Sequence, residues 1–176
     1  MESQGSVSQE SVGTVVSTRL PVFGHAPFSG TYRTRMEANG RLVLPAALRS
    51  PFLEASAAHV MPRTATVLWL LTPQGFDVLA DALHTDRTRG IVDPRTRARF
   101  YMRAPKVSVD RQSRLVVPPE LRERAGISGE AEVVLAGAIE HVELWPAQQW
   151  DAEEAARLDD ADLLFEGFEG LPTGPA

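Results

Sequence analysis

Residues 41–49 read Arg-Leu-Val-Leu-Pro-Ala-Ala-Leu-Arg, and residues 114–122 read Arg-Leu-Val-Val-Pro-Pro-Glu-Leu-Arg. Six of these nine positions are identical, at an offset of 73 residues. The same offset aligns Val60 with Val133. The chain therefore contains one sequence unit twice, and an internal repeat of this kind indicates two copies of one supersecondary structure.

Each unit is predicted to run as strand, tight turn, strand, short helix, further strands and a closing helix. A strand is expected over 31–36, and Asn39-Gly40 after it is a strong hairpin signal because both residues tolerate a positive φ. The next strand, 41–44, ends at Pro45. The short helix is expected over 46–49 in the first unit and over 119–125 in the second.

The later parts of the units carry clear strand and helix patterns. Gly126 is expected to end the short helix of the second unit. The runs 67–71 and 141–145 are rich in strand-forming residues. The closing helix of the first unit is predicted by apolar residues at helical spacing, Phe76, Leu79, Ala80 and Leu83, and in the second unit Trp150 and Leu158 form a weaker stripe.

These patterns predict an α+β fold, in which two β-rich units pack into one pseudo-symmetric domain with short flanking helices. Packing together is expected because a unit of about 50 residues is only marginally stable alone. In chain order we expect a flexible N-terminal extension, a first repeat, an Arg-rich connector helix, a second repeat and an acidic, disordered C-terminal tail, at 1–27, 28–84, 85–103, 104–158 and 159–176.

The connector is predicted to hold a helix that begins at Asp93-Pro94, a capping residue followed by a proline in the first turn. One stripe of this helix carries Arg95, Arg99 and Arg103, and the other side carries Ala98, Tyr101 and Met102. The arginines suit either a phosphate-facing ridge or a solvated face with ion pairs along the helix.

Charge is distributed unevenly along the chain, although the total is only −5. Residues 1–84 carry six Arg and six acidic residues, residues 85–124 carry ten Arg and one Lys against five acidic residues, and residues 125–176 carry one Arg against twelve. Salt screens charges beyond roughly 8–10 Å, so the basic central segment can meet a polyanion despite the acidic C-terminal part.

Each unit has an acidic residue four positions before an arginine at its turn, Glu37 with Arg41 and Asp110 with Arg114. A carboxylate at the start of a tight turn can accept backbone N–H bonds, and it can also hold the guanidinium of the returning strand. An arginine held in this way can bind phosphate or a guanine edge. The alternative is that both pairs only stabilise their turns, but their duplication favours a recognition surface.

These residues resemble the MraZ family of bacterial transcriptional regulators, over about 28–158. The similarity lies in the doubled turn motif and in short matches that flank it, namely Phe28-x-Gly30, Asn39-Gly40-Arg41-Leu42 with Pro45, Asp110-x-x-x-Arg114-Leu115, Leu121-Arg122, Ala125-Gly126 and Glu143-Leu144-Trp145 with Trp150. The resemblance implies two tandem AbrB-like swapped-hairpin units, in which the hairpins face DNA and the subunits close into a ring.

The resemblance further implies which residues bind DNA. Arg41 and Arg114 are expected to contact double-stranded DNA, with Glu37 and Asp110 bracing them, and the expected set also includes Arg33, Arg35 and Arg111. The chain has Glu37 where the family has Asp, a longer and poorer turn cap. Ser113 replaces the usual Gly before the arginine, which predicts a different backbone conformation in the second turn.

An enzyme is not expected. The chain has no Cys, its four His residues lack metal-ligand spacing, and neither a nucleophile elbow nor a P-loop is present. No cofactor, metal or membrane span is expected, and the start of the chain does not read as a secretory signal. The resemblance to the MraZ family then implies a cytoplasmic, nucleoid-associated regulator of its own division and cell-wall gene cluster, acting as a homo-oligomeric ring for which an octamer is one candidate.

A second hypothesis is an AbrB-type interaction module or antitoxin. In that case the acidic tail, 159–176, would bind a partner protein through its interspersed Phe165, Phe168 and Leu171. The doubled unit favours the regulator, because antitoxins of this type usually carry one copy.

Overall fold

The computed structural model describes residues 24–88 and 93–157. The predicted N-terminal extension, the predicted acidic tail and Leu158 therefore lie largely or wholly outside the described residues. The elements of the first half are β1 (Thr31–Met36), β2 (Arg41–Val43), α1 (Ser50–Ala55), β3 (Ala57–Pro62), β4 (Leu68–Leu71) and α2 (Pro73–Thr88). After α3 (Pro94–Met102) come β5 (Lys106–Ser108), β6 (Arg114–Val116), α4 (Pro119–Arg124), β7 (Ala131–Ala138), β8 (His141–Pro146) and α5 (Ala147–Arg157).

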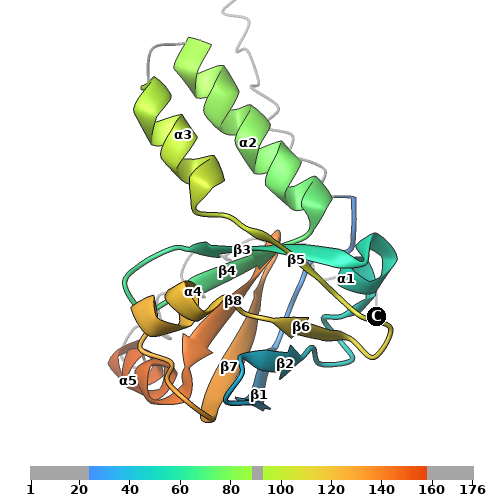
Figure 1. The fold of residues 1–176 in the computed structure, drawn as a ribbon, viewed down its shortest axis with the longest axis vertical. Coiled ribbons are helices and arrows are strands. Elements are labelled where there is room, and N and C mark those ends of the chain that lie inside the picture. The colour runs from blue at the N-terminus through green and yellow to red at the C-terminus, as the bar shows by residue number, and fades with distance from the viewer. Residues whose placement is uncertain (1–23, 89–92, 158–176) are drawn as a thin grey trace, which may run out of the picture.

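The fold is α+β, as expected from the sequence, and every strand pair in the described residues is antiparallel. Six strands form one sheet in the order β1-β7-β8-β4-β3-β5, and β2 pairs with β6 in a separate two-stranded ribbon. The 73-residue offset matches β1 with β5, β2 with β6, β3 with β7 and β4 with β8. Exchanging the members of each match reverses the order of the large sheet and leaves every pair of neighbouring strands unchanged. The pairing of β2 with β6 obeys the same exchange, so the connectivity has a pseudo-twofold pattern. The two strands of the ribbon lie side by side in Figure 1.

The main core lies between the large sheet and the ribbon. Leu42 and Leu115, which face each other across the ribbon, are 0% and 2% exposed and belong to one apolar cluster with β7 residues Val133 and Leu135. Phe52 of α1 and Leu121 of α4 join the same cluster. The ribbon is therefore anchored by the inward half of its alternating side chains.

The opposite face of the large sheet packs against α5 and against the beginning of α2. Val134, which alternates with the core residues of β7, packs with Trp145 and with Trp150 of α5. Phe76 of α2 stacks on Phe100 of α3 at a ring-centroid distance of 5.1 Å. The predicted stripe of α2 is confirmed, because Phe76 and Ala80 are buried and Leu79 and Leu83 are half-buried.

Helix α3 begins where the sequence predicts, but only part of the side expected to be apolar packs against α2. The Asp93 side chain accepts hydrogen bonds from the backbone N–H groups of Arg95 and Thr96. Phe100 stacks on Phe76, and Tyr101 from the expected side meets the same ring edge-on at a centroid distance of 5.4 Å, whereas Met102 is 80% exposed. Because Phe100 can stack on Phe76, the helix turns that side toward α2 and leaves Met102 outside.

Two local expectations in the first half are wrong. Asn39-Gly40 does form a turn, but the strands that it joins do not form a ladder with each other, since β1 pairs with β7 and β2 with β6. The short helix expected over 46–49 is a turn, and α1 begins only at Ser50. Pro51 explains the shift, because a helix that ran on from residue 46 would need a backbone N–H that proline lacks.

The α4 end matches the expectation and has a standard cap. Gly126, at φ 73°, donates its backbone N–H to the Glu123 carbonyl, and Ile127 donates to the Arg122 carbonyl at 2.8 Å. This pair of bonds is a Schellman motif, which satisfies carbonyl groups at the helix end and needs the left-handed conformation that glycine adopts readily.

The inward and outward sides of the ribbon predict different costs of truncation. Leu115→Ala is expected to lower the free energy of unfolding by about 2–5 kcal/mol, because it leaves a cavity under the ribbon. Val116→Ala, at a 47% exposed position on the same strand, should cost less than about 1 kcal/mol. Denaturant unfolding of both variants measures the difference, and equal losses would contradict the packing of the ribbon.

Candidate nucleic-acid interface

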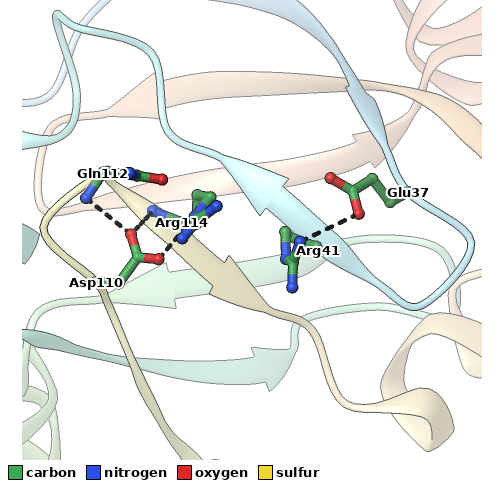
Figure 2. A network of polar contacts seen from close by, with 5 residues as sticks. All are labelled: Glu37, Arg41, Asp110, Gln112 and Arg114. Carbon is green, nitrogen blue, oxygen red and sulfur yellow. Dashed lines mark hydrogen bonds and ion pairs between the residues drawn. The ribbon is translucent and has the colours of Figure 1, made fainter.

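The second turn, residues 110–114, is organised by the carboxylate of Asp110. Its Oδ1 accepts hydrogen bonds from the backbone N–H groups of Gln112 and Arg114, both at 2.9 Å, and its Oδ2 accepts one from Arg114 Nε at 2.7 Å (Figure 2). The bond from the Arg114 backbone N–H, then those from its guanidinium and from Gln112, hold the pKa of Asp110 below the ordinary 3.8. One carboxylate thus closes the turn and directs the Arg114 guanidinium.

The first turn, residues 37–41, divides these tasks between two side chains. Glu37 Oε2 lies 3.7 Å from Arg41 Nη1, which is an ion-pair distance (Figure 2). The backbone N–H of Arg41 donates instead to Asn39 Oδ1 at 2.9 Å. Asn39 therefore supplies the turn-closing acceptor that the longer Glu37 side chain does not, a role that the sequence analysis missed although asparagine is a typical turn residue.

The backbones of the two turns are alike. Glu37 N–H donates to the Arg41 carbonyl at 2.9 Å, and Asp110 N–H donates to the Arg114 carbonyl at the same distance. Gly40 has φ 85° and Ser113 has φ 64°, so both adopt the left-handed conformation. The expectation that Ser113 would change the backbone of the second turn is therefore wrong.

Hydrogen bonds between the two halves explain why Ser113 accepts this conformation. The Leu44 backbone N–H donates to the Ser113 carbonyl at 2.8 Å, and the equivalent Val117 N–H donates to the Gly40 carbonyl at 2.9 Å. Each turn is thus locked to the strand end of the other half. The Arg122 guanidinium of α4 also donates to the Ala38 carbonyl at 3.0 Å, an inter-half contact that no local sequence pattern indicated.

The ribbon presents four side chains to the outside. Arg41 lies directly opposite Val116, and Val43 lies opposite Arg114. Residues directly opposite in an antiparallel pair share a face, so this face combines two guanidinium groups with two valine side chains. A hollow of about 410 Å³ lies on it, lined by Arg41, Val107, Ser108, Asp110, Arg114, Leu115 and Val116.

Three further arginines expected at the site lie elsewhere or only beside it. Arg33 and Arg35 are on β1, on the sheet face that packs against α5, since Arg33 is opposite Val134. Arg33 pairs with Asp151 and Arg35 with Glu130, the latter at 2.9 Å. Arg111 is exposed in the second turn. The structure therefore brings together Arg41, Arg114 and their carboxylates with Arg111, and leaves Arg33 and Arg35 on the far face.

The arginines of α3 form a separate exposed surface. Arg95, Arg99 and Arg103 are all exposed, and α3 stands with α2 away from the sheet and far from the ribbon (Figure 1). A second hollow, of about 330 Å³, lies beside α5 and has both charges in its lining, with Arg63 and Arg157 near Glu143 and Glu153. The ribbon differs from both surfaces because its arginines are held in direction by their own turns.

Residues 24–88 and 93–157 contain no cluster of three or more His, Asp or Glu side chains that could hold a metal ion. Within the same residues, none of the helices combines the length and the apolar character needed to cross a bilayer.

Comparisons with known proteins point to one family. A family model described as "MraZ protein, putative antitoxin-like" matches residues 100–162. A protein of Desulfosudis oleivorans named "Transcriptional regulator MraZ" is 31% identical over 142 residues, which cover 81% of this chain and 94% of the relative. A protein of the same name from Clavibacter michiganensis subsp. michiganensis is 34% identical over 151 residues, covering 80% and 99%. One from Limosilactobacillus fermentum is 29% identical, covering 82% and 98%. The three relatives are named as transcriptional regulators, which does not favour the interaction-module hypothesis.

The different acceptors in the two turns predict different costs of carboxylate removal. Asp110→Ala is expected to lower the melting temperature more than Glu37→Ala, because only Asp110 accepts turn N–H bonds. The lowered pKa of Asp110 means that its ionised form stabilises the fold above the unfolded-state value. This contribution is lost as pH falls below about 3.8 through the folded-state value, so the gap between wild type and Asp110→Ala should shrink there.

Thermal melting of both variants between pH 7 and pH 2 tests this expectation. Equal losses for the two variants, or a gap for Asp110→Ala that does not change with pH, would contradict it.

Proposed function

We propose that this chain, which belongs to the MraZ family, is a transcriptional regulator that binds double-stranded DNA through the outer face of the β2·β6 ribbon. The observation that carries the proposal is the pair of outward arginines, Arg41 and Arg114, each held by a carboxylate of its own turn. A guanidinium with a fixed direction loses less conformational freedom when it binds a phosphate or a guanine edge. The proposed role is binding rather than catalysis.

The shape and charge of the ribbon suit the major groove of DNA. The groove of B-DNA is about 12 Å wide and admits a two-stranded β-ribbon. Arg41 and Arg114 side chains remain 42% and 38% exposed although both are ion-paired, so their outer N–H groups stay available. Arg111, exposed in the second turn, is proposed to add a phosphate contact. Arg33 and Arg35 lie on the opposite face of the large sheet from the ribbon, which argues against a direct role for them.

The architecture is proposed to be a tandem pair of AbrB-like swapped-hairpin units. The recurring element order and the ladder between β2 and β6 support this assignment, because each half contributes one strand and one turn to a shared ribbon. The two turns are then equivalent members of one DNA-facing surface rather than separate sites.

The protein is further proposed to act as a homo-oligomeric ring in the cytoplasm, in association with the nucleoid, on the promoter of its own gene cluster. Several ribbons on one assembly would bind neighbouring sites on DNA together, so weak contacts of single ribbons would add up through effective concentration. The direct test of the target is binding to the DNA upstream of the protein's own gene.

The role of the two arginines gives the central prediction. Arg41→Ala and Arg114→Ala should leave the melting temperature nearly unchanged, because both side chains are on the surface. Each should weaken binding to the upstream DNA by about 1–3 kcal/mol if the lost contact is to a base. Arg35→Ala, which removes an ion-paired arginine from the far face, is the matched control and should bind as the wild type does. Fluorescence anisotropy and thermal melting measure both properties.

The salt dependence of the same binding curves separates phosphate contacts from base contacts. The logarithm of the affinity should fall linearly with the logarithm of salt concentration, with a slope of about −0.9 per neutralised phosphate.

The arginine substitutions can also contradict the proposal. An Arg114→Ala protein that melts early and still binds DNA normally would mean that the arginine is structural, and it would contradict the proposed DNA contact of that turn.

Assembly is checked independently of DNA. Light scattering of the full chain at micromolar concentration should report a mass well above that of a dimer of the 19.2 kDa chain. A monomer under these conditions would rule out the ring without affecting the proposed DNA contacts.

A further inference from the structure

Two exposed valines on the ribbon have no role in the binding described so far. Val43 and Val116 are each 47% exposed and occupy equivalent positions in the two halves. Each lies directly opposite an arginine of the other strand, Val43 beside Arg114 and Val116 beside Arg41. The outer face therefore repeats one arrangement twice, a guanidinium next to a branched apolar side chain.

Strand preference alone does not account for this arrangement. Threonine also favours strands and suits exposed positions, so a strand former with only methyl groups is not required there by the fold. The inward residues Leu42 and Leu115 already supply the anchoring contacts of the ribbon. Val116 also lines the hollow that contains Arg41 and Arg114, which places apolar surface within the same concave site as the cations.

We infer that Val43 and Val116 contact the C5-methyl groups of thymines in the major groove and thereby select thymine beside the bases that Arg114 and Arg41 contact. The inference rests on the proposed function and deepens it. The thymine methyl is the one apolar group that a base pair presents in the major groove, and apolar side chains recognise it by direct contact. Two valines beside two arginines thus supply sequence discrimination that the guanidinium groups alone do not.

The spacing of the ribbon is compatible with reading neighbouring base pairs. Side chains directly opposite in an antiparallel pair have Cβ atoms about 4.5–5.5 Å apart. Residues two positions apart on one strand are separated by about 6.8 Å, close to two base-pair steps of about 3.4 Å. An arginine and the valine across from it therefore reach adjacent base pairs, and the pseudo-twofold pattern repeats this pair within the same short site.

The experiment compares two versions of one duplex, the DNA upstream of the protein's own gene with thymine and the same sequence with uracil at every thymine. Uracil keeps the hydrogen-bonding groups and lacks only the methyl. The full chain should bind the uracil duplex about four-fold more weakly for each methyl contact that is lost. The double variant Val43→Ala/Val116→Ala should bind the thymine duplex more weakly than the wild type and should bind both duplexes equally.

The control is Met102→Ala, which truncates an exposed apolar side chain on α3, away from the ribbon, and should retain the wild-type preference for thymine. Thermal melting verifies that all variants are folded. Equal binding of the wild type to both duplexes would overturn the thymine contacts and leave DNA binding intact. The same uracil sensitivity in wild type and double variant would overturn them too, because the methyl effect would then act through DNA shape. Failure to bind either duplex would instead remove the proposed function itself.

Discussion

The pairing of β2 with β6 is the interaction on which the rest of the structure depends. A strand of three residues has few backbone bonds of its own, and here its partner comes from the other half of the chain. The pairing buries Leu42 against Leu115, aligns both turns at the two ends of one ribbon and forces four side chains outward. Neither half can form this surface alone, so the repeat in the sequence is a requirement for the site as well as for the core.

The two turns reach one geometry with different residues because the constraint comes from across the ribbon. In both turns the residue before the arginine, 40 or 113, has a positive φ, and its carbonyl accepts an N–H from the opposite half. At Gly40 a Cβ would lie 2.7 Å from the Val117 carbonyl oxygen and 2.6 Å from Arg122 Nε, so glycine is required by space as well as by φ. Ser113 adopts the same conformation while nearly buried, at 1% exposure, and there the Asp110 cap offsets the cost of a non-glycine residue.

Features that depend on neighbouring residues were predictable from the sequence, and features that depend on the partner of a strand were not. The strand at 31–36, the Asp93 cap and the Gly126 helix end follow from local patterns and are present. The candidate site was predictable as far as the four turn residues, because the acid-to-arginine spacing repeats. The ion pairs of the β1 arginines were not predictable. Arg33 pairs with Glu132 of β7 and with Asp151 of α5, and Arg35 pairs with Glu130 just before β7, residues that only the sheet order brings near. Val43 and Val116 read as ordinary strand residues until their pairing with arginines is known.

The fold determines which of the unevenly distributed charges of the chain pair with one another. Acidic residues of the C-terminal half, such as Glu130 and Asp151, pair with the arginines of β1 on the face that packs against α5. On the ribbon the carboxylates belong to the turns themselves and lie beside the guanidinium groups that they orient (Figure 2). A polyanion would therefore meet guanidinium groups that are oriented by their own turns on the ribbon, whereas the arginines of β1 lie on the opposite face and pair with carboxylates from other parts of the chain. Because exposed charges act only over roughly 8–10 Å, this local arrangement, and not the total of −5, decides which surface attracts a polyanion.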